Sequence, residues 1–265
     1  MSKKIACLVK VIPDVDHFTY DYKKNILVRE NQRSVLNPDD ACAAAAALDL
    51  KKKVDAQVTA VTMGPESSLK YMEDLLRRGA DRGVLITDPA YRGSDTYVTA
   101  KILAGYLEKE GFDLIFCGTR TLDGDTSHIP SQVAELLNMN VMNHVVKVAE
   151  SQQSEEEVTV KVKDETESLL FAIDLPAVIA LSSDSKYKLP FVKYEDRKKD
   201  VSDRLTIITN DDLHLALEET GLEGSKTKVV RTYPKHCEYK EKKVVQNDEQ
   251  GIEYVYEYLK EKGFL

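Results

Sequence analysis

The organisation of the chain is clearest in the stretch Leu114-Ile115-Phe116-Cys117-Gly118-Thr119-Arg120-Thr121-Leu122-Asp123-Gly124-Asp125-Thr126-Ser127-His128-Ile129-Pro130. Its first four residues are all apolar, which is typical of a parallel strand buried on both faces. The amphipathic segment 131–137 that follows predicts a helix. Gly and Asp are frequent in the turn between them. The stretch therefore predicts a strand, a turn and a helix in succession.

This succession is a common layout of nucleotide sites in α/β proteins. Main-chain N–H groups at the helix start, with the small residues Gly124, Thr126 and Ser127, can approach phosphate oxygens closely and donate to them. The carboxylates of Asp123 and Asp125 would repel a phosphate, so we expect them to cap the turn, accept from its amides or bind ribose hydroxyls. An ordinary surface turn that ends in a helix cap is the alternative, because Gly-Asp turns are common.

Apolar runs and helical patterns alternate along the first half of the chain. The predicted strands cover 5–11, 57–62, 83–87 and 114–117, the predicted helices cover 41–53, 67–78 and 96–110, and segments 18–22 and 26–29 predict a hairpin. Asn37 is the expected N-cap of the first helix, with Pro38 in its first turn. This alternation predicts an α/β fold with a doubly wound, Rossmann-like parallel sheet.

Several predicted strands end in segments that could form one site. Ligands of such sheets bind in the crevice beyond the carboxyl ends of the strands. Segments 10–13, 63–65 and 118–130 are all such ends, and the helix start at Asn37 and Pro38 can reach the same crevice. We therefore expect these four segments to converge on a ligand.

The pattern changes after about residue 140. Segments 141–148, 158–162 and 168–173 predict a small antiparallel meander, and the apolar segment 177–181 predicts a return to the main sheet. Segment 183–200 mixes both signs of charge with apolar residues, which marks partner contacts as well as plain solvated loops. Beyond residue 205 the hydrophobic pattern is thin until 248–262, which predicts a helix with one apolar face. We therefore expect an α/β domain over 1–204 and an extended C-terminal arm over 205–265 that needs a second polypeptide.

Composition excludes several classes of protein. The 37 Lys and Arg against 45 Asp and Glu give a net charge of −8, which argues against a nucleic-acid partner. No apolar run approaches the ~20 residues of a membrane helix and no signal-peptide pattern is present, so we expect a cytoplasmic protein without a membrane partner. The cysteines and histidines lack metal-ligand spacing, so we expect no metal. Catalytic motifs are missing, and we assign no catalytic residue.

A series of short motifs stands in fixed order along residues 4–181. They are Val9-Lys10-Val11-Ile12-Pro13-Asp14, Leu36-Asn37-Pro38, Thr62-Met63-Gly64-Pro65, Gly79-Ala80-Asp81-Arg82, Gly93-Ser94-Asp95-Thr96, Cys117-Gly118 and Asp123-Gly124-Asp125-Thr126. In this order and spacing they resemble the beta (small) subunit of electron transfer flavoproteins. The resemblance implies a Rossmann-like domain of the adenine nucleotide alpha hydrolase type that pairs with an alpha subunit.

The resemblance also implies a cofactor and a reaction. Housekeeping members hold AMP, whereas electron-bifurcating members hold FAD, and segment 123–126 looks like the bifurcating form. The implied FAD exchanges hydride with NAD(H), and its electrons part toward ferredoxin and, through the alpha-subunit FAD, toward a flavin-dependent dehydrogenase. The residues implied to bind the cofactor are Leu8, Lys10, Pro13, Asn37, Pro38, Asp39, Met63, Gly64, Gly118, Thr119, Arg120, Leu122, Asp123, Gly124, Asp125, Thr126, Ser127, His128 and Ile129.

The chain departs from the family's usual pattern in two places. His128 stands in the loop where bifurcating relatives usually have Gln, although Thr126 and Ser127 still suit phosphate contact. Relatives that serve acyl-CoA dehydrogenases carry a basic recognition loop with an anchoring Leu. Here acids interrupt the basic run of segment 183–200, in which Leu189 is the expected anchor with Phe191 close by. We therefore favour a lactate-type 2-hydroxyacid dehydrogenase as partner over an acyl-CoA dehydrogenase.

Two other functions stay open on the sequence alone. A non-bifurcating electron transfer flavoprotein beta subunit with structural AMP would share the same fold. A stand-alone nucleotide-binding module of the universal-stress type would need no alpha subunit, but it would give no reason for the arm after residue 205.

Overall fold

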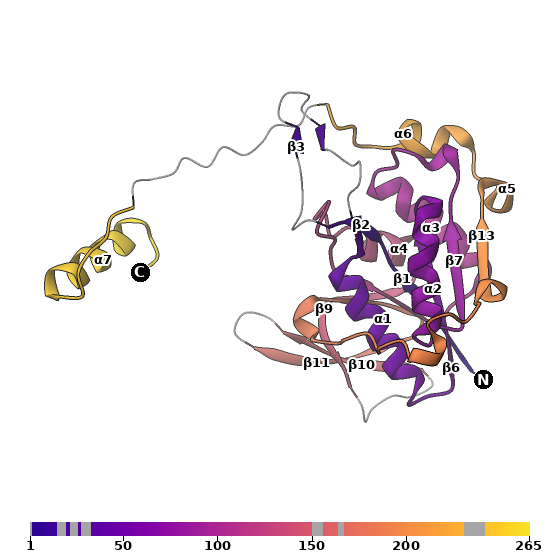
Figure 1. Ribbon diagram of the computed structural model, residues 1–265, viewed down its shortest axis with the longest axis horizontal. Coiled ribbons are helices and arrows are strands. Elements are labelled where there is room, and N and C mark those ends of the chain that lie inside the picture. The colour runs from indigo at the N-terminus through magenta and orange to yellow at the C-terminus, as the bar shows by residue number, and fades with distance from the viewer. Residues whose placement is uncertain are drawn as a thin grey trace. The chain divides into compact units, whose positions relative to one another are not determined.

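The structure is a computed structural model that describes residues 2–14, 20–21, 26–27, 33–149, 156–163, 167–230 and 242–265. The chain divides into two compact units, residues 1–230 and residues 231–265. Figure 1 labels the helices and many of the strands. In the described part of the chain, no helix combines the length and the apolar character needed to cross a membrane.

Nine of the described strands of the first unit form one sheet in the order β11-β10-β9-β12-β8-β1-β6-β7-β13. Every neighbouring pair from β9 to β13 in this order is parallel. The parallel strands are β9 Asn140–Val148, β12 Ala177–Leu181, β8 Leu114–Gly118, β1 Lys3–Leu8, β6 Ala56–Met63, β7 Arg82–Ile86 and β13 Leu205–Ile208. The predicted α/β fold with a mainly parallel sheet is confirmed.

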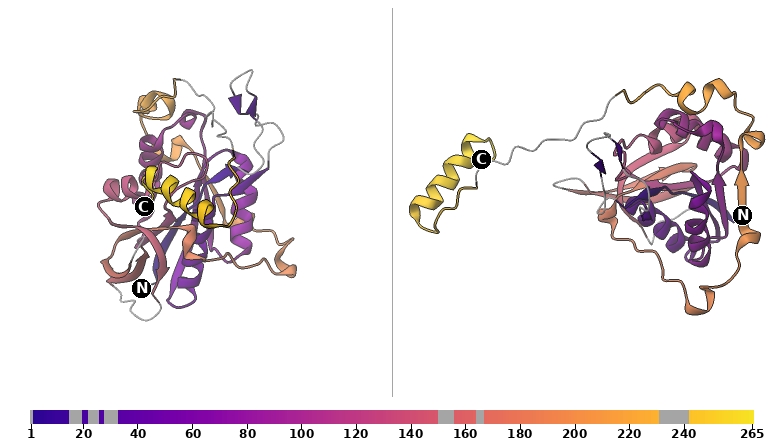
Figure 2. Two further views of the ribbon diagram at one scale, coloured as in Figure 1. Left: turned by 90° about the vertical axis from the view of Figure 1, so that its left-hand side faces the viewer. Right: turned by 45° about the horizontal axis from the view of Figure 1, so that its top comes forward.

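Helices cover both faces of this sheet, as Figures 1 and 2 show. The helices α1 Pro38–Lys51 and α2 Leu69–Arg77 pack on the face to which Ile5 and Cys7 of β1 point. The helices α3 Thr96–Glu110 and α4 Ile129–Leu137 pack on the other face, to which Ala6 and Leu8 point. Successive residues of β1 are therefore buried on opposite sides, which explains why this strand is a continuous apolar run.

The shorter elements frame these layers. They are the strands β2 Val11–Pro13, β3 Tyr20–Asp21, β4 Ile26–Leu27 and β5 Ser34–Leu36, the helices α5 Asn210–Leu213 and α6 Gly221–Gly224, and the 3-10 turns 66–68, 89–91, 183–185, 194–196, 202–204 and 217–219. The antiparallel pairing of β3 with β4 agrees with the predicted hairpin, whose connecting residues 22–25 lie outside the described residues. The strand predicted over 5–11 differs in the structure, because β1 ends at Leu8 and β2 is a separate strand that pairs antiparallel with β5.

The meander consists of β9, β10 Glu157–Lys163 and β11 Ser168–Asp174, paired antiparallel. It is not a separate sheet, because β9 also pairs in parallel with β12. Alternate residues of β10, such as Val158 and Val160, are buried in the same cluster as α1. The sequence therefore predicts the meander correctly, and its attachment to the main sheet comes from the pairing of β9.

The chain leaves the first unit later than the expected boundary at residue 204. Strand β13 pairs in parallel with β7 and forms the edge of the sheet. Its Leu205 packs against the core cluster, beside Gly83. Farther on, the Asp95 carboxylate at the start of α3 accepts hydrogen bonds from the main-chain N–H and the hydroxyl of Thr227, at 2.8 and 3.0 Å. Residues 205–230 therefore belong to the α/β unit.

The second unit contains α7, Glu249–Glu261, within the helix predicted at 248–262. The Asp248 side chain caps it by accepting from the Gly251 N–H at 2.8 Å. The apolar side chains of α7, among them Ile252 and Val255, are exposed within the described part of the chain. This helix therefore presents an apolar surface that its own unit does not bury.

The approach of α1 to β8 requires the absence of a side chain at Gly118. The residues Ala43 to Ala47 are all buried, and such small side chains let a helix lie close to a sheet. A Cβ atom at Gly118 would lie 2.3 Å from Asp40 Oδ1, 2.7 Å from Asp39 Cβ and 2.8 Å from the Asp40 main-chain nitrogen. The first turn of α1 therefore occupies the space that any other residue at position 118 would need.

We expect Gly118→Ala to lower the free energy of unfolding by about 1–3 kcal/mol, because the added methyl group displaces the start of α1. Urea denaturation of the full chain measures this change. Gly105→Ala in α3 is the matched control: nothing lies within 4 Å of its Cβ position. That variant should be neutral or stabilised by up to ~1 kcal/mol. Equal stability of both variants would contradict the close approach.

Candidate nucleotide site

The three predicted strand ends lie on the adjacent strands β8, β1 and β6. In the order β12-β8-β1-β6, all four strands run in parallel, so the loops that follow them leave the same edge of the sheet. These loops begin at Ser182, Thr119, Val9 and Gly64. The start of α1 reaches the same edge through its side chains. The order of the strands therefore brings these segments to one edge of the sheet.

Side chains of the first turn of α1 bind the main chain of the neighbouring loops. Asn37 Nδ2 donates to the Arg120 carbonyl oxygen at 2.8 Å, and Asn37 Oδ1 accepts from the Leu122 N–H at 3.2 Å. Asp39 Oδ1 accepts from the Ser183 N–H, beyond β12, at 2.8 Å. Asn37 stands at the N-cap position but makes no side-chain cap bond to its own helix. Asn37 therefore does not cap the helix with its side chain as predicted, because its side-chain amide hydrogen-bonds to the loop after β8.

Asp40 makes the most buried of these contacts. Its Oδ1 accepts from the Gly118 N–H at 2.9 Å, and its Oδ2 accepts from the Lys10 N–H at 2.8 Å. Burial raises the pKa of this carboxyl to about 7, although its hydrogen bonds with Lys10, Asn37 and Gly118 act in the opposite direction. The sequence predicts no site role for Asp40, because two acids in the first turn of a helix are already explained by the helix dipole.

Each carboxylate of the loop after β8 pairs with a cation. Lys10 Nζ lies 3.0 and 2.8 Å from the two carboxylate oxygens of Asp123, and Arg120 Nη1 lies 3.2 Å from Asp125 Oδ1. Partial burial opposes ionisation of Asp123, but the bonds from Lys10 and Thr121 outweigh it and hold the pKa of this carboxyl below its ordinary value. The repulsion that two free carboxylates would exert on a phosphate is therefore reduced.

The backbone of this loop suits an anion. Asp125 and Ser127 have φ angles of 49° and 56°, in the left-handed region, whereas Gly124 and Thr126 do not. Residues that alternate between positive and negative φ angles point successive N–H groups toward one side, and such nests bind anions. Residues 122–128 are exposed, and α4 begins directly afterwards at Ile129. His128 Nδ1 lies 3.5 Å from Thr96 Oγ1 at the start of α3. The loop can therefore offer donors to a phosphate.

Some of the expected site residues serve the fold instead of a surface. Leu8 and Thr119 are buried, and the Thr119 hydroxyl donates to the Ala180 carbonyl oxygen at 3.3 Å. Met63 and Gly64 line a neighbouring cavity of about 560 Å³ between the ends of β6, β7 and β13. In the described part of the chain, the lining of this cavity includes no residue of the loop 118–129. The residues expected to bind the cofactor are therefore divided between the loop after β8 and this second cavity.

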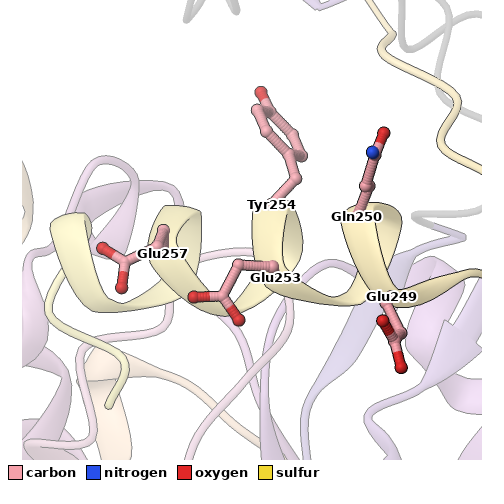
Figure 3. A pocket seen from close by; sticks show the side chains of 5 residues that line it. All are labelled: Glu249, Gln250, Glu253, Tyr254 and Glu257. Carbon is pink, nitrogen blue, oxygen red and sulfur yellow. The ribbon is translucent and has the colours of Figure 1, made fainter.

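A hollow on α7 does not suit a nucleotide. It is lined by Glu249, Gln250, Glu253, Tyr254 and Glu257, all from one helix (Figure 3). Carboxylates predominate in this lining, and they repel phosphate groups. The hollow is therefore a feature of the helix surface.

Comparison with known proteins places this geometry in a family. Residues 24–202 match the family model described as electron transfer flavoprotein domain. The electron transfer flavoprotein subunit beta of Thermoanaerobacterium thermosaccharolyticum is 35% identical over 232 residues, 86% of each chain. The acryloyl-CoA reductase electron transfer subunit gamma of Anaerotignum propionicum is 30% identical over 87% of this chain and 88% of its own. A subunit of the caffeyl-CoA reductase-Etf complex of Acetobacterium woodii is 30% identical over 87% of each chain.

We expect Lys10→Met to raise the pKa of Asp123 toward its ordinary value, because the ammonium group that stabilises the carboxylate is removed. The lowered pKa of Asp123 stabilises the fold at pH values above the pKa of this carboxyl in the unfolded chain. The stabilisation is lost as the pH falls through its pKa in the folded chain, so Lys10→Met should lose less stability in acid. Carboxyl ¹³C NMR titration measures the shift. Arg120→Met, which removes the partner of Asp125, is the control and should leave Asp123 unchanged. The same Asp123 titration in both variants would contradict the pairing.

Proposed function

We propose that this chain, which belongs to the electron transfer flavoprotein family as a beta subunit, binds an adenine-nucleotide cofactor at the loop 118–129. The observation that carries the proposal is the left-handed backbone of Asp125 and Ser127 at a helix start, beside carboxylates already paired with Lys10 and Arg120. Beta subunits of this family pair with alpha subunits and act as electron-transfer subunits of oxidoreductase complexes. The stand-alone signalling module that the sequence left open does not agree with this membership.

The residues present fit the phosphates of such a cofactor. Main-chain N–H groups of Gly124 and of residues 126–129 and the hydroxyls of Thr126 and Ser127 are suitable donors, and the loop is exposed. The Asp125 N–H already donates to the Thr121 carbonyl oxygen at 2.8 Å. Arg120, within the loop, and Lys10, which follows β1, are each already paired with one carboxylate of the loop. FAD, when bound, would supply hydride and electron transfer, while the chain orients it and balances its charge.

We propose FAD in place of AMP, with electron bifurcation as the activity. The support is the resemblance of segment 123–126 to the bifurcating form of the loop. In this proposal NAD(H) exchanges hydride at the complex, and electrons pass to ferredoxin and, through the alpha-subunit FAD, to a partner dehydrogenase in the cytoplasm, where NAD(H) and ferredoxin are available. A carrier with structural AMP is the second candidate, and counting flavins per heterodimer separates the two: two for the first, one for the second.

The segment 183–200 is the proposed surface for the partner dehydrogenase. Leu189 is partly buried and packs against the core cluster, so it is not the exposed anchor that the sequence suggested. Phe191 is 96% exposed and Tyr194 is 88% exposed. Arg78 donates to the Pro190 carbonyl oxygen and Arg77 to that of Lys199, so both ends of this part of the segment are tied to α2. Phe191 is therefore the better anchor.

The identity of this dehydrogenase is a proposal from the charge pattern. The relatives named for acryloyl-CoA and caffeyl-CoA reductases show that acyl-CoA enzymes serve as partners elsewhere in the family. In this chain Glu195 and Asp196 interrupt the basic residues of the segment. A lactate-type 2-hydroxyacid dehydrogenase fits this mixed charge better. Oxidation of lactate by NAD⁺ would run the same electron transfers in the reverse direction, and it needs electrons from reduced ferredoxin as a second driving force.

The C-terminal unit is the proposed contact for the alpha subunit. Ile252 and Phe264 are 61% and 75% exposed, which is unusual for a helix that functions alone. We expect residues 242–265 to be cleaved by protease more slowly once the alpha subunit covers them. Limited proteolysis with and without that subunit measures the rates. Equal resistance to the protease in both states would show that the alpha subunit does not protect the C-terminal unit.

We expect Asp125→Ala and Thr126→Val each to weaken FAD or AMP binding about tenfold to a hundredfold, or ~1–3 kcal/mol. The first change removes the partner of Arg120 from a left-handed position, and the second removes a hydroxyl donor. Isothermal titration calorimetry of the heterodimer measures the affinity. Glu135→Ala, on the exposed side of α4, is the control and should bind as the parent does. Parent-like affinity in both loop variants would falsify the assignment of this loop.

We expect Phe191→Ala to raise the KM for the partner dehydrogenase about tenfold with little change in kcat, because an exposed aromatic anchor contributes to docking. The assay is NAD⁺ reduction by the reconstituted complex with reduced ferredoxin, using lactate or an acyl-CoA as donor. Leu217→Ala, a similarly exposed residue outside the segment, is the control. Turnover with acyl-CoA alone would rule out the lactate-type partner, and parent kinetics in Phe191→Ala would rule out the anchor.

A further inference from the structure

Asp40 lies beneath the nucleotide loops without belonging to them. It is buried, and its two carboxylate oxygens accept from the N–H groups of Lys10 and Gly118, which follow and end the adjacent strands β1 and β8. Lys10 carries the ammonium group that pairs with Asp123, and Gly118 begins the loop 118–129. One carboxylate therefore joins the two main-chain segments that border the proposed site.

The arrangement around Asp40 suits the ionised form. The N–H groups of Lys10 and Gly118 donate to it, and the Asn37 side chain also hydrogen-bonds to it. A carboxylate accepts such bonds on both oxygens, whereas a carboxylic acid has a proton of its own that needs an acceptor. A proton on Asp40 therefore competes with one of the two N–H groups, and the bond on that side is weakened.

Among the described residues, the ionisable side chains that interact with Asp40 add no cation. Asp39 is its neighbour on α1, and Cys7 of β1 is buried on the face of the sheet that α1 covers. Cys117 of β8 is buried on the other face, and its thiol also interacts electrostatically with Asp40. Burial raises the pKa of both thiols, so both stay neutral near pH 7. The ammonium group of Lys10 is engaged with Asp123. The charge of Asp40 is therefore balanced by main-chain dipoles, and it can be lost by protonation.

We infer that Asp40 is a positioning residue of the nucleotide site, and that its ionised form holds the loops after β1 and β8 in the arrangement that binds the nucleotide. The inference rests on the proposed function and extends it to regulation: the affinity of the site falls when Asp40 takes up a proton.

Acidification has opposite effects on the fold and on the site. The pKa of Asp40 is about 7 in the folded chain, above its ordinary value of 3.8. Between these values the folded chain binds more protons than the unfolded chain, so Asp40 makes the fold more stable as pH decreases from above 7 toward 4. Nucleotide affinity should decrease over the upper part of the same range, because the proton weakens one of the two main-chain bonds. If Asp40 had only a structural role, acidification would not change the stability of the fold and the nucleotide affinity in opposite directions.

The experiment measures FAD affinity and urea stability of the heterodimer from pH 5.5 to 8.5. FAD is the probe because a terminal phosphate such as that of AMP titrates near a pKa of about 6, whereas the diphosphate of FAD has no such group. The variant Asp40→Asn keeps the size of the side chain but offers one acceptor in place of two. Asp113→Asn is the matched control, since Asp113 accepts from the Lys4 N–H at 2.7 Å near the opposite ends of the same strands.

We expect the parent to bind FAD about tenfold more weakly at pH 6 than at pH 8. Over the same interval its free energy of unfolding should increase as the pH falls, once the profile of Asp40→Asn is subtracted. Asp40→Asn should bind weakly at every pH, and Asp113→Asn should keep the parent's pH profile. If Asp40→Asn does not fold, ¹³C NMR titration of the parent decides: the midpoint for Asp40 must match that of the affinity.

The outcomes separate the inference from the proposed function. A parent that binds neither FAD nor AMP at any pH refutes the nucleotide site and the inference with it. A parent that binds FAD with an affinity that does not change with pH, or an Asp40→Asn variant that binds as the parent does, refutes only the positioning role of Asp40.

Discussion

The hydrogen bonds from the first turn of α1 to the main chain of the strand ends are the constraint on which the site depends. Parallel strands are not joined by hairpins, so the loops at their carboxyl ends need another support. Asn37, Asp39 and Asp40 supply it by binding the loops after β8, β12 and β1. These polar groups are buried and hydrogen-bonded to donors or acceptors, and loss of one bond would leave a main-chain group unsatisfied. The loops are therefore held in place before any ligand binds.

This support requires close packing. The buried alanines of α1 and the missing side chain at Gly118 allow the helix start to lie against the end of β8. The same closeness removes Asp40 from water, which is why its pKa rises to about 7. Packing and ionisation are thus linked, because the contact that orders the loops also makes the carboxylate sensitive to pH near neutrality.

Two exposed apolar surfaces suit the role of a subunit within a larger complex. The segment 183–200 presents Phe191 while Arg77 and Arg78 tie it to α2, so its shape is set by the rigid unit. Helix α7 presents Ile252 and Val255 on a separate unit. One surface belongs to the α/β unit and the other belongs to the C-terminal unit, which agrees with separate partners for the two.

Sequence alone determined the order of strands and helices, the loop at 118–130 and the membership of the family, because hydrophobic period and short motifs are local properties of a chain. Only the tertiary structure decided the partner of Lys10, which lies 113 positions from Asp123, and the hydrogen bond from the Gly118 N–H to Asp40, which lies 78 positions from Gly118. It also assigned β13 to the sheet, since four residues are too few to show a period. Burial of Leu189 and exposure of Phe191 were decided in the same way, because exposure depends on neighbours that are distant in the sequence.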